Sequence, residues 1–248
     1  MSKLPISAVL ITKNEAHNLP RCIGSLSFCS EVIVLDSGST DNTVGVAESL
    51  GAKVHKTVDW PGFGPQKNRA LSFATQPWVL SIDADEWVEA DLATSIKQHL
   101  QNKPDQPAKV LRASSFCGKT MRYCGWGDDW VLRLFKRGSG EFSPDLVHER
   151  LIVRGTPGEL EGTLGHESFV TLSDVLRKID HYSSAWAEQA YRSGKRGGPI
   201  KAMVKGLAAG FKTLVLKQGW RDGKHGWLLA ITNAHGTFYK YAKLWLKQ

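Results

Sequence analysis

The chain has 248 residues, 42% of them hydrophobic, and a formal net charge of +8. This length and composition allow a sizeable buried core and exclude an intrinsically disordered protein. No run of 18 apolar residues occurs, and the N-terminal residues enter a strand pattern without the features of a signal peptide. We therefore predict a cytoplasmic protein with one α/β domain and an appendage.

Two βα units open the chain. Residues 6–11 form an apolar run typical of a buried strand, and apolar residues at helical spacing follow Asn14. A second run at residues 32–35 leads into a polar turn cluster at 36–41 and a short helix that ends near Gly51. This alternation of strand and helix predicts a mostly parallel sheet with helices on its faces.

The alternation continues with a short strand at 53–55, a helix at 66–75 and a strand at 78–82. Shorter strands follow at 110–116 and 131–135, separated by loops rich in glycine and aromatic residues. After Leu172 the pattern becomes helical, with a basic glycine-rich linker at 194–199. We predict an α/β part at residues 1–172 and a basic helical extension at residues 173–248.

The positive charge is concentrated in this extension. From Arg177 onward, 14 Lys and Arg residues stand against three acids, giving +11, whereas residues 1–176 hold 18 against 21, giving −3. Within it, Val204, Leu207, Phe211 and Val215 recur at helical spacing among lysines, which predicts an amphipathic helix. Such a helix either packs on the α/β part or lies among lipid headgroups, where each Lys or Arg adds roughly 1 kcal/mol.

Acidic clusters fall at the carboxyl ends of two predicted strands, where open α/β sheets bind their ligands. Asp83 and Asp85 follow an apolar strand two residues apart, so one can reach a ribose while the other binds a cation. Mg²⁺ and Mn²⁺ prefer such oxygen ligands. Asp36 is placed to accept a hydrogen bond from a base such as uracil, or to cap the helix entry at Ser39 and Thr40.

Two further groups extend this predicted nucleotide site. Thr12, Asn14 and Glu15 lie at the end of the first strand and are expected to hold the base or the ribose, with helix capping by Asn14 as the alternative. Lys67 and Arg69 lie near the start of a helix and are expected to meet a pyrophosphate, unless they form an ordinary solvated face.

Four ordered motifs carry a family resemblance. They are Ile11-Thr12-Lys13-Asn14-Glu15, Asp36-Ser37-Gly38-Ser39-Thr40-Asp41-Asn42-Thr43, Gly64-Pro65-Gln66-Lys67-Asn68-Arg69-Ala70 and Ser81-Ile82-Asp83-Ala84-Asp85-Glu86. The succession resembles family-2 glycosyltransferases, specifically the branch of lipopolysaccharide-core β-1,4-glucosyltransferases. It covers residues 6–90 and continues more loosely through Val147-His148-Glu149, Trp220-Arg221-Asp222-Gly223 and Lys240-Tyr241-Ala242-Lys243.

The resemblance implies a GT-A fold, a UDP-sugar donor and an inverting single displacement. It also implies an acceptor in a lipid-linked core oligosaccharide at the cytoplasmic face of the membrane. Residues 1–105 then form the nucleotide-sugar half and residues 106–172 the acceptor half. Family-like roles place Asp36 on uracil, Asp83 on ribose and Asp85 on the metal, which is Mg²⁺ or Mn²⁺. Two acceptor-side motifs that are usual in family 2 are absent: the Glu-Asp pair that supplies the general base, and QxxRW.

An inverting displacement needs a carboxylate that deprotonates the incoming hydroxyl group. We predict Glu149 for this role, with Asp145 as the alternative and a surface acid without a catalytic role as the third interpretation. His148 and His166 are candidates to complete the metal shell, although a single histidine is more often structural.

The sequence thus predicts a metal-dependent transferase that moves a hexose, glucose by the resemblance, to a lipid-linked oligosaccharide beside an anionic membrane surface. A polyprenyl-phosphate glycosyltransferase would share the same donor site. A basic nucleic-acid-binding protein and an inactive sugar-nucleotide-binding module are the alternatives from other classes. No RNP-like, zinc-finger or helix-turn-helix pattern occurs, so we predict no nucleic-acid partner.

Overall fold

The computed structural model describes residues 3–144 and 149–248 of the chain. The chain folds into two compact units, an α/β unit of residues 1–112 and 129–166 and a helical unit of residues 113–128 and 167–248. The sequence had assigned residues 113–128 and 167–172 to the α/β part, and the structure groups both segments with the C-terminal helices instead. Local periodicity does not report this grouping, because it depends on contacts between residues far apart in the sequence.

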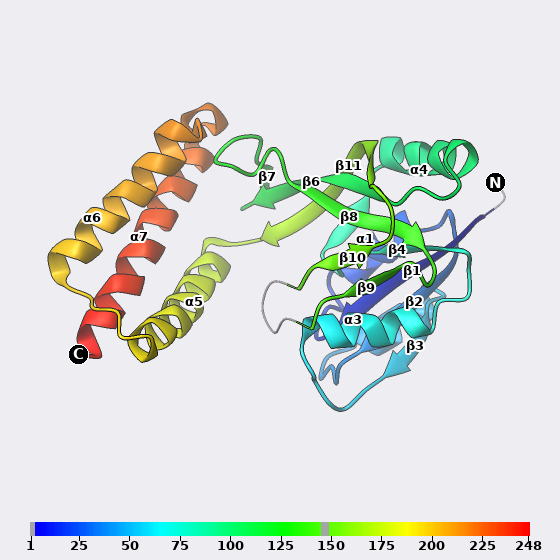
Figure 1. Cartoon of the computed structure of the whole chain (residues 1–248), viewed down its shortest axis with the longest axis horizontal. Coiled ribbons are helices and arrows are strands. Elements are labelled where there is room, and N and C mark those ends of the chain that lie inside the picture. Colours follow the sequence, from blue (N-terminus) through cyan, green and yellow to red (C-terminus); the bar gives the residue numbers. More distant parts are fainter. Residues whose placement is uncertain (1–2, 145–148) are drawn as a thin grey trace. The chain divides into compact units, whose positions relative to one another are not determined.

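Four parallel strands form the first half of the α/β unit (Figure 1). Strand β1 (Leu4–Thr12) lies between β2 (Cys29–Asp36) and β4 (Trp78–Ser81), and β3 (Lys53–Lys56) pairs with β2. Helices α1 (Leu19–Ser25), α2 (Thr43–Ser49) and α3 (Phe63–Ser72) connect these strands. The predicted βα units are therefore confirmed, and the carboxyl ends of β1, β2 and β4 lie at one edge of the sheet.

The remaining strands make the sheet mixed. Strand β8 (Trp130–Lys136) pairs antiparallel with both β4 and β6 (Ala108–Phe116), and β11 (Gly158–Phe169) pairs antiparallel with β5 (Glu86–Val88). Three short strands complete the set among the described residues. They are β7 (Lys119–Thr120), which pairs with β6, and β9 (Gly140–Phe142) with β10 (Leu151–Val153), which form a separate hairpin.

The alternation of side chains along β1 divides the core of the α/β unit into two layers. Ile6, Ala8 and Leu10 are buried in one cluster with apolar residues of α1, α2 and α4 (Ala90–Asn102). Val9 belongs to a second cluster, which contains Ala70 of α3 and neighbouring residues of β2, β4 and β8. Because successive strand residues point to opposite faces, helices cover both sides of the parallel strands.

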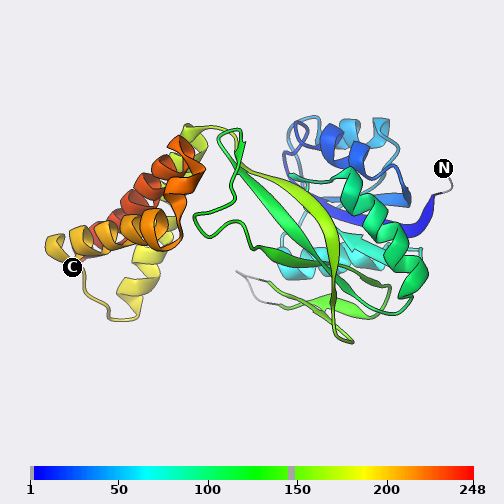
Figure 2. The same ribbon diagram turned by 90° about the horizontal axis from the view of Figure 1, so that it is seen from above.

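The helical unit consists mainly of α5 (Leu172–Arg192), α6 (Pro199–Phe211) and α7 (Lys224–Leu246), with α6 and α7 side by side (Figure 2). A capping box formed by Thr171 and Asp174 begins α5. A π-helical turn, η1 (Lys212–Leu216), and a 3₁₀ turn, η2 (Gly219–Asp222), connect α6 to α7. The predicted basic helical extension is present.

The segment Trp220-Arg221-Asp222-Gly223 serves the internal structure of the helical unit. Asp222 is buried, and its carboxylate accepts hydrogen bonds from the backbone N–H groups of Arg122 (3.2 Å) and Tyr123 (2.8 Å). The Arg221 guanidinium lies 4.2 Å from the centre of the Tyr123 ring. These contacts attach η2 to the segment at residues 113–128, which explains why that segment belongs to the helical unit.

The described helices include none that is both long enough and apolar enough to cross a bilayer. All four cysteines are free. Burial raises the pKa of Cys29 to about 12 and that of Cys124 to about 11, so neither thiol is a ready nucleophile at neutral pH.

Candidate active site

The turn that follows β2 forms the first part of the site. Asp36, opposite Thr12 in the sheet register, is buried, and one carboxylate oxygen accepts the N–H groups of Gly38 (3.1 Å) and Ser39 (2.9 Å). The other oxygen accepts the hydroxyl groups of Thr12 (3.2 Å) and Ser39. Asp36 thus fixes the turn beyond the strand, whereas Asn42 occupies the N-cap of α2.

The loop after β1 is joined to this turn by direct hydrogen bonds. Asn14, at a positive φ of 59°, accepts the N–H of Thr40 through its side-chain oxygen (2.8 Å). The N–H of Asn14 donates to the Ser39 hydroxyl at 2.8 Å, and the Glu15 carboxylate accepts the amide of Asn18 at 2.7 Å. Asn18 occupies the N-cap of α1, so helix capping by Asn14 is not observed. Asn14 instead couples the two loops.

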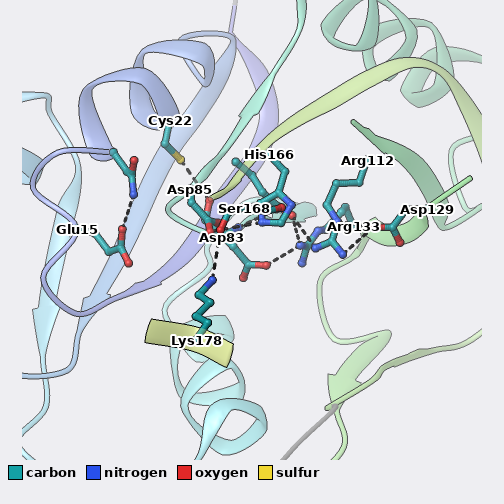
Figure 3. A network of polar contacts seen from close by, with 12 residues as sticks. Glu15, Cys22, Asp83, Asp85, Arg112, Asp129, Arg133, His166, Ser168 and Lys178 are labelled. Carbon is teal, nitrogen blue, oxygen red and sulfur yellow. Dashed lines mark hydrogen bonds and ion pairs between the residues drawn. The ribbon is translucent and has the colours of Figure 1, made fainter. Parts of the chain in front are cut away.

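The second part of the site is a cluster of acids and cations around Asp83, in which Arg133 and Glu86 are buried (Figure 3). A single nitrogen of Arg133, Nη2, lies 2.6 Å from the Asp83 carboxylate and 2.5 Å from that of Glu86. Glu86 also accepts the backbone N–H of Asp83 at 3.0 Å. Arg112 approaches Glu86 at 3.4 Å and pairs with Asp129 at 2.8 Å. Asp83 is therefore held through both its backbone and its side chain.

The carboxyl groups of Asp83 and Glu86 have opposite pKa shifts. Burial raises the pKa of Glu86, and repulsion from Asp83 adds to it, so the pKa is above its ordinary value even though Arg133 is close. Burial also acts on Asp83, but the charges of Arg133 and Lys67 outweigh it and hold the pKa of Asp83 well below its usual range. Asp83 is consequently ionised at neutral pH and can only accept hydrogen bonds.

Helix α3 supplies the third part of the site. Its Lys67 ammonium lies 2.9 Å from Asp83 and 3.1 Å from Glu149, which brings the predicted base beside the predicted ribose ligand. This approach depends on Gly64, one turn earlier. A Cβ atom there would lie 2.0 Å from the carbonyl oxygen of Ser143, so only glycine permits the close contact between α3 and this segment.

The neighbours of Lys67 in the same motif have distinct partners. Gln66 is fully buried and donates to the hydroxyl groups of Ser37 (3.0 Å) and Thr57 (2.6 Å). Asn68 exchanges two hydrogen bonds with the backbone of Phe142, at 2.7 and 2.8 Å, and so attaches α3 to β9. Arg69 forms a two-pronged ion pair with Asp59, so any contact of Arg69 with a pyrophosphate would require it to leave that partner.

The two predicted metal ligands that the structure describes are neighbours. The Asp85 carboxylate lies 3.5 Å from Nε2 of His166, because His166 stands opposite Glu86 in the antiparallel pairing of β11 with β5. His148, and the alternative base Asp145, lie outside the described residues. The described part of the chain contains no group of three acid, histidine or cysteine side chains that would enclose a metal.

This donor set is compatible with a cation whose remaining ligands come from a substrate. Mg²⁺ commonly uses one or two carboxylates together with phosphate oxygens and water. Asp85 is more exposed than Asp83, with relative side-chain areas of 36% and 30%, so its carboxylate is accessible to a diphosphate. A carboxylate and an imidazole thus fit a shared site better than a closed protein site.

Sequence reasoning missed Arg133, Glu86 and Arg112 as members of the site. A signal was present, since Arg133 and Arg112 each interrupt an apolar strand run, and a charged residue in a buried strand requires a partner. The partner itself was not predictable, because Arg133 and Glu86 are 47 positions apart.

The model of the family described as "Glycosyl transferase family 2" matches residues 7–137. A lipopolysaccharide core biosynthesis glycosyltransferase, LpsC of Rhizobium meliloti, is 32% identical over 98% of this chain and 93% of its own length. An uncharacterized glycosyltransferase of Rickettsia felis is 28% identical over 96% of this chain and 89% of its own length.

Matches among solved structures are partial. Crystal structures of glucosyl-3-phosphoglycerate synthase from Mycobacterium tuberculosis are 30% identical, at a TM-score of 0.37. They cover 46% of this chain and 44% of theirs. One holds Mn²⁺, UDP and glucosyl-3-phosphoglycerate, and another holds Mg²⁺ and UDP.

Proposed function

Because this chain belongs to glycosyl transferase family 2, we propose that it transfers a hexose, with glucose as the first candidate, from a UDP-sugar to a lipid-linked lipopolysaccharide core oligosaccharide, with inversion. The relative named for lipopolysaccharide core biosynthesis supports this choice of acceptor. One observation carries the proposal. Lys67 forms ion pairs with both Asp83 and Glu149, and Asp83 lies at the end of the central strands.

The donor is bound at the ends of β1, β2 and β4. Asp83 is ionised and accepts hydrogen bonds from the ribose hydroxyl groups, while Thr12, Asn14 and Glu15 line the neighbouring loop. Asp36 is assigned to uracil, but its oxygens already accept four hydrogen bonds, two of them from the rotatable hydroxyl groups of Thr12 and Ser39. Binding of uracil therefore requires one of these hydroxyl groups to turn away.

Transfer requires a base for the acceptor and stabilisation of the leaving group. Glu149 takes the proton of the acceptor hydroxyl while that oxygen attacks the anomeric carbon from the face opposite UDP, and the bond to the diphosphate breaks. Asp85 and His166 are the residues to hold Mg²⁺ or Mn²⁺, which when bound offsets the negative charge of the diphosphate. Lys67 holds Glu149 beside Asp83 and adds positive charge near the diphosphate.

Calorimetry and turnover together test these roles. Asp85→Ala is expected to weaken UDP binding in the presence of Mn²⁺ and to abolish transfer. Glu149→Gln is expected to abolish transfer while UDP binds as in the wild type. Glu159→Gln, an exposed acid on β11, is the matched control for the loss of one charge. Turnover retained in Glu149→Gln would move the base elsewhere, and a chain that binds no uridine diphosphate compound with either metal would refute the donor site.

The acceptor is tested separately with UDP-glucose as donor. Transfer to a lipid-linked core oligosaccharide, and none to polyprenyl phosphate, is the expected result. The reverse outcome would assign the same donor site to a polyprenyl-phosphate glycosyltransferase.

Helix α6 supports a peripheral position on an anionic membrane. It packs against α7 through small residues, of which Ala202 and Gly206 are buried, and leaves its large apolar residues exposed. Leu207 and Phe211 are 67% and 58% exposed, and Lys201 and Lys205 lie on the same helix. This arrangement fits a helix that inserts apolar side chains among lipid headgroups.

Vesicle cosedimentation tests this attachment. The double variant Leu207→Ser with Phe211→Ser is expected to lose binding to vesicles that contain phosphatidylglycerol, whereas Leu172→Ser with Leu176→Ser, an exposed apolar pair on α5, retains it. Equal losses in the two double variants would refute a specific role for α6.

A further inference from the structure

The helical unit contains an open cavity of about 450 Å³, a size typical of small-molecule sites. Its floor is apolar and is formed by Phe116, Trp126 and Phe169, whose ring centres lie 6.0 to 6.4 Å apart, together with Val175, Ile179 and Leu229. All its lining residues belong to this unit, and none of them is a residue of the candidate active site.

Four lysines line the same cavity: Lys178 from α5, Lys212 from the start of η1, Lys217 directly after η1, and Lys240 from α7. None of them forms an ion pair with a carboxylate of the described residues. Four of the six acids in the unit have other partners: Asp174 with Arg177, Asp180 with Lys243, Glu188 with Arg192 and Lys247, and Asp222 with backbone N–H groups. The cavity therefore has a cationic rim without internal compensation.

Local contacts fix the turn that carries Lys212 and hold Lys178 beside the apolar floor. The π-helical turn of η1 contributes Lys212, and such turns are frequent at functional sites. Thr213, at its second position, donates to Ala209 at 3.0 Å and accepts the amide of Asn233 at 3.1 Å, which fixes the turn against α7. Lys178 donates to the carbonyl of Ser168 and lies 4.5 Å from the centre of the Phe169 ring, where floor and rim meet.

We propose that this cavity binds the phosphate-bearing end of a single lipid molecule, with the phosphate among the lysines and the first carbons of the chain against the aromatic floor. Inorganic phosphate would leave the apolar floor in water, and a neutral hydrocarbon would leave the four cations uncompensated. Only a ligand that joins the two chemistries satisfies both parts of the cavity. The proposal goes beyond glycosyl transfer and does not depend on the donor site.

Calorimetry on the full chain with three probes tests the ligand class. The probes are dihexanoyl phosphatidate below its micelle concentration, inorganic phosphate and hexanol. We expect the phosphatidate to bind at least tenfold more tightly than inorganic phosphate, and hexanol not to bind measurably. Equal affinity for phosphatidate and phosphate would overturn the proposal in favour of a free phosphate site, and equal affinity for phosphatidate and hexanol would overturn the role of the lysines.

Two kinds of variant separate the cavity from general surface attraction. Lys212→Gln with Lys240→Gln is expected to weaken phosphatidate binding about tenfold or more, and the control Lys195→Gln with Lys224→Gln, which removes the same charge outside the cavity, is expected to leave it unchanged. Gly236→Leu places a branched side chain inside the cavity, which Gly236 lines, and keeps every charge. The nearest atom to a Cβ at Gly236 is 3.6 Å away on Ile179, so the backbone tolerates the side chain.

Gly236→Leu is therefore expected to abolish phosphatidate binding with an unchanged circular dichroism spectrum. UDP binding with Mn²⁺, measured on the same samples, is expected to stay at the wild-type level in all three variants, which separates this proposal from that of the donor site. Undiminished phosphatidate binding in Gly236→Leu, or equal losses in the two lysine pairs, would refute the cavity as the binding site.

Discussion

Replacing Arg133 by methionine tests how the charged cluster supports the site. The arginine is 7% exposed and Glu86 is 0% exposed, so the substitution leaves a buried carboxylate without its nearest cation. Removing one partner of a buried ion pair costs about 3 to 5 kcal/mol. Arg112 remains 3.4 Å from Glu86 and Asp83 is partly exposed, so we expect a loss near the lower end of that range, about 3 kcal/mol.

A double-mutant cycle isolates the charge effect. Glu86→Gln added to Arg133→Met removes the unpaired charge and is expected to recover about 1 to 2 kcal/mol, because an amide needs hydrogen bonds but no counter-ion. The free energy of unfolding is measured by guanidinium chloride denaturation, with hydrogen exchange of the β4 amides as a readout of the α/β unit alone. Arg137→Met, one residue beyond the end of β8, where the side chain is exposed, is the control and should cost less than about 0.5 kcal/mol.

The same variant has a predicted effect on activity. Arg133 is one of the two cations that lower the pKa of Asp83, so its loss raises that pKa. If transfer requires ionised Asp83, the acidic limb of kcat/KM moves to higher pH in Arg133→Met. A cost no larger than that of Arg137→Met, together with an unmoved acidic limb, would refute the supporting role of Arg133 in this cluster.

Three further predictions concern the framework around the site. Glu31 has a pKa lowered to about 2, since hydrogen bonds from Lys53 and neighbouring hydroxyl and amide groups outweigh its burial, so Glu31→Gln is expected to cost about 2 to 3 kcal/mol at pH 7. The difference in free energy of unfolding between the wild type and this variant, measured by denaturation at several pH values, should have its whole value above about pH 4.5 and vanish as the pH falls toward 2. A difference that does not depend on pH would contradict this prediction. Gly64→Ala places a methyl group against Ser143 and is expected to cost about 1 to 3 kcal/mol and to lower kcat/KM, unlike Gly24→Ala, whose Cβ meets nothing within 4 Å. Asp222→Ala leaves two backbone N–H groups unpaired and should lower the melting temperature by several degrees, and an unchanged value would show that the loop it holds has other support.

The βα half of the fold was predictable because each of its elements has a local signature. Apolar runs mark β1, β2 and β4, and polar turn residues follow them directly. Parallel strands have their carboxyl ends at one edge of the sheet, and this rule predicts that Asp36 and Asp83 lie at the same edge. The antiparallel strands β6, β8 and β11 were harder to arrange, because their order depends on long-range pairing that no short pattern encodes.

The site was predictable where a residue acts through its position on a strand, and less so where it acts through a distant partner. Lys67 and Arg69 were expected to act together, but residues two apart on a helix do not share a face. Their separate partners, Asp83 and Asp59, follow from that geometry. Helical geometry alone would have favoured one of the two cations for the site, although it would not have said which.

Glu86 connects the two halves of the predicted donor site. It accepts the backbone N–H of Asp83 and shares Arg133 with the Asp83 side chain, so it fixes the orientation of the proposed ribose ligand. Its strand, β5, also pairs with β11 and places His166 within 3.5 Å of Asp85, the proposed metal ligands. Since Glu86 is fully buried, it cannot reach a substrate itself. We therefore predict that Glu86 is a positioning residue: its carboxylate holds Asp83 directly, and its strand pairs with the strand that carries His166 beside Asp85.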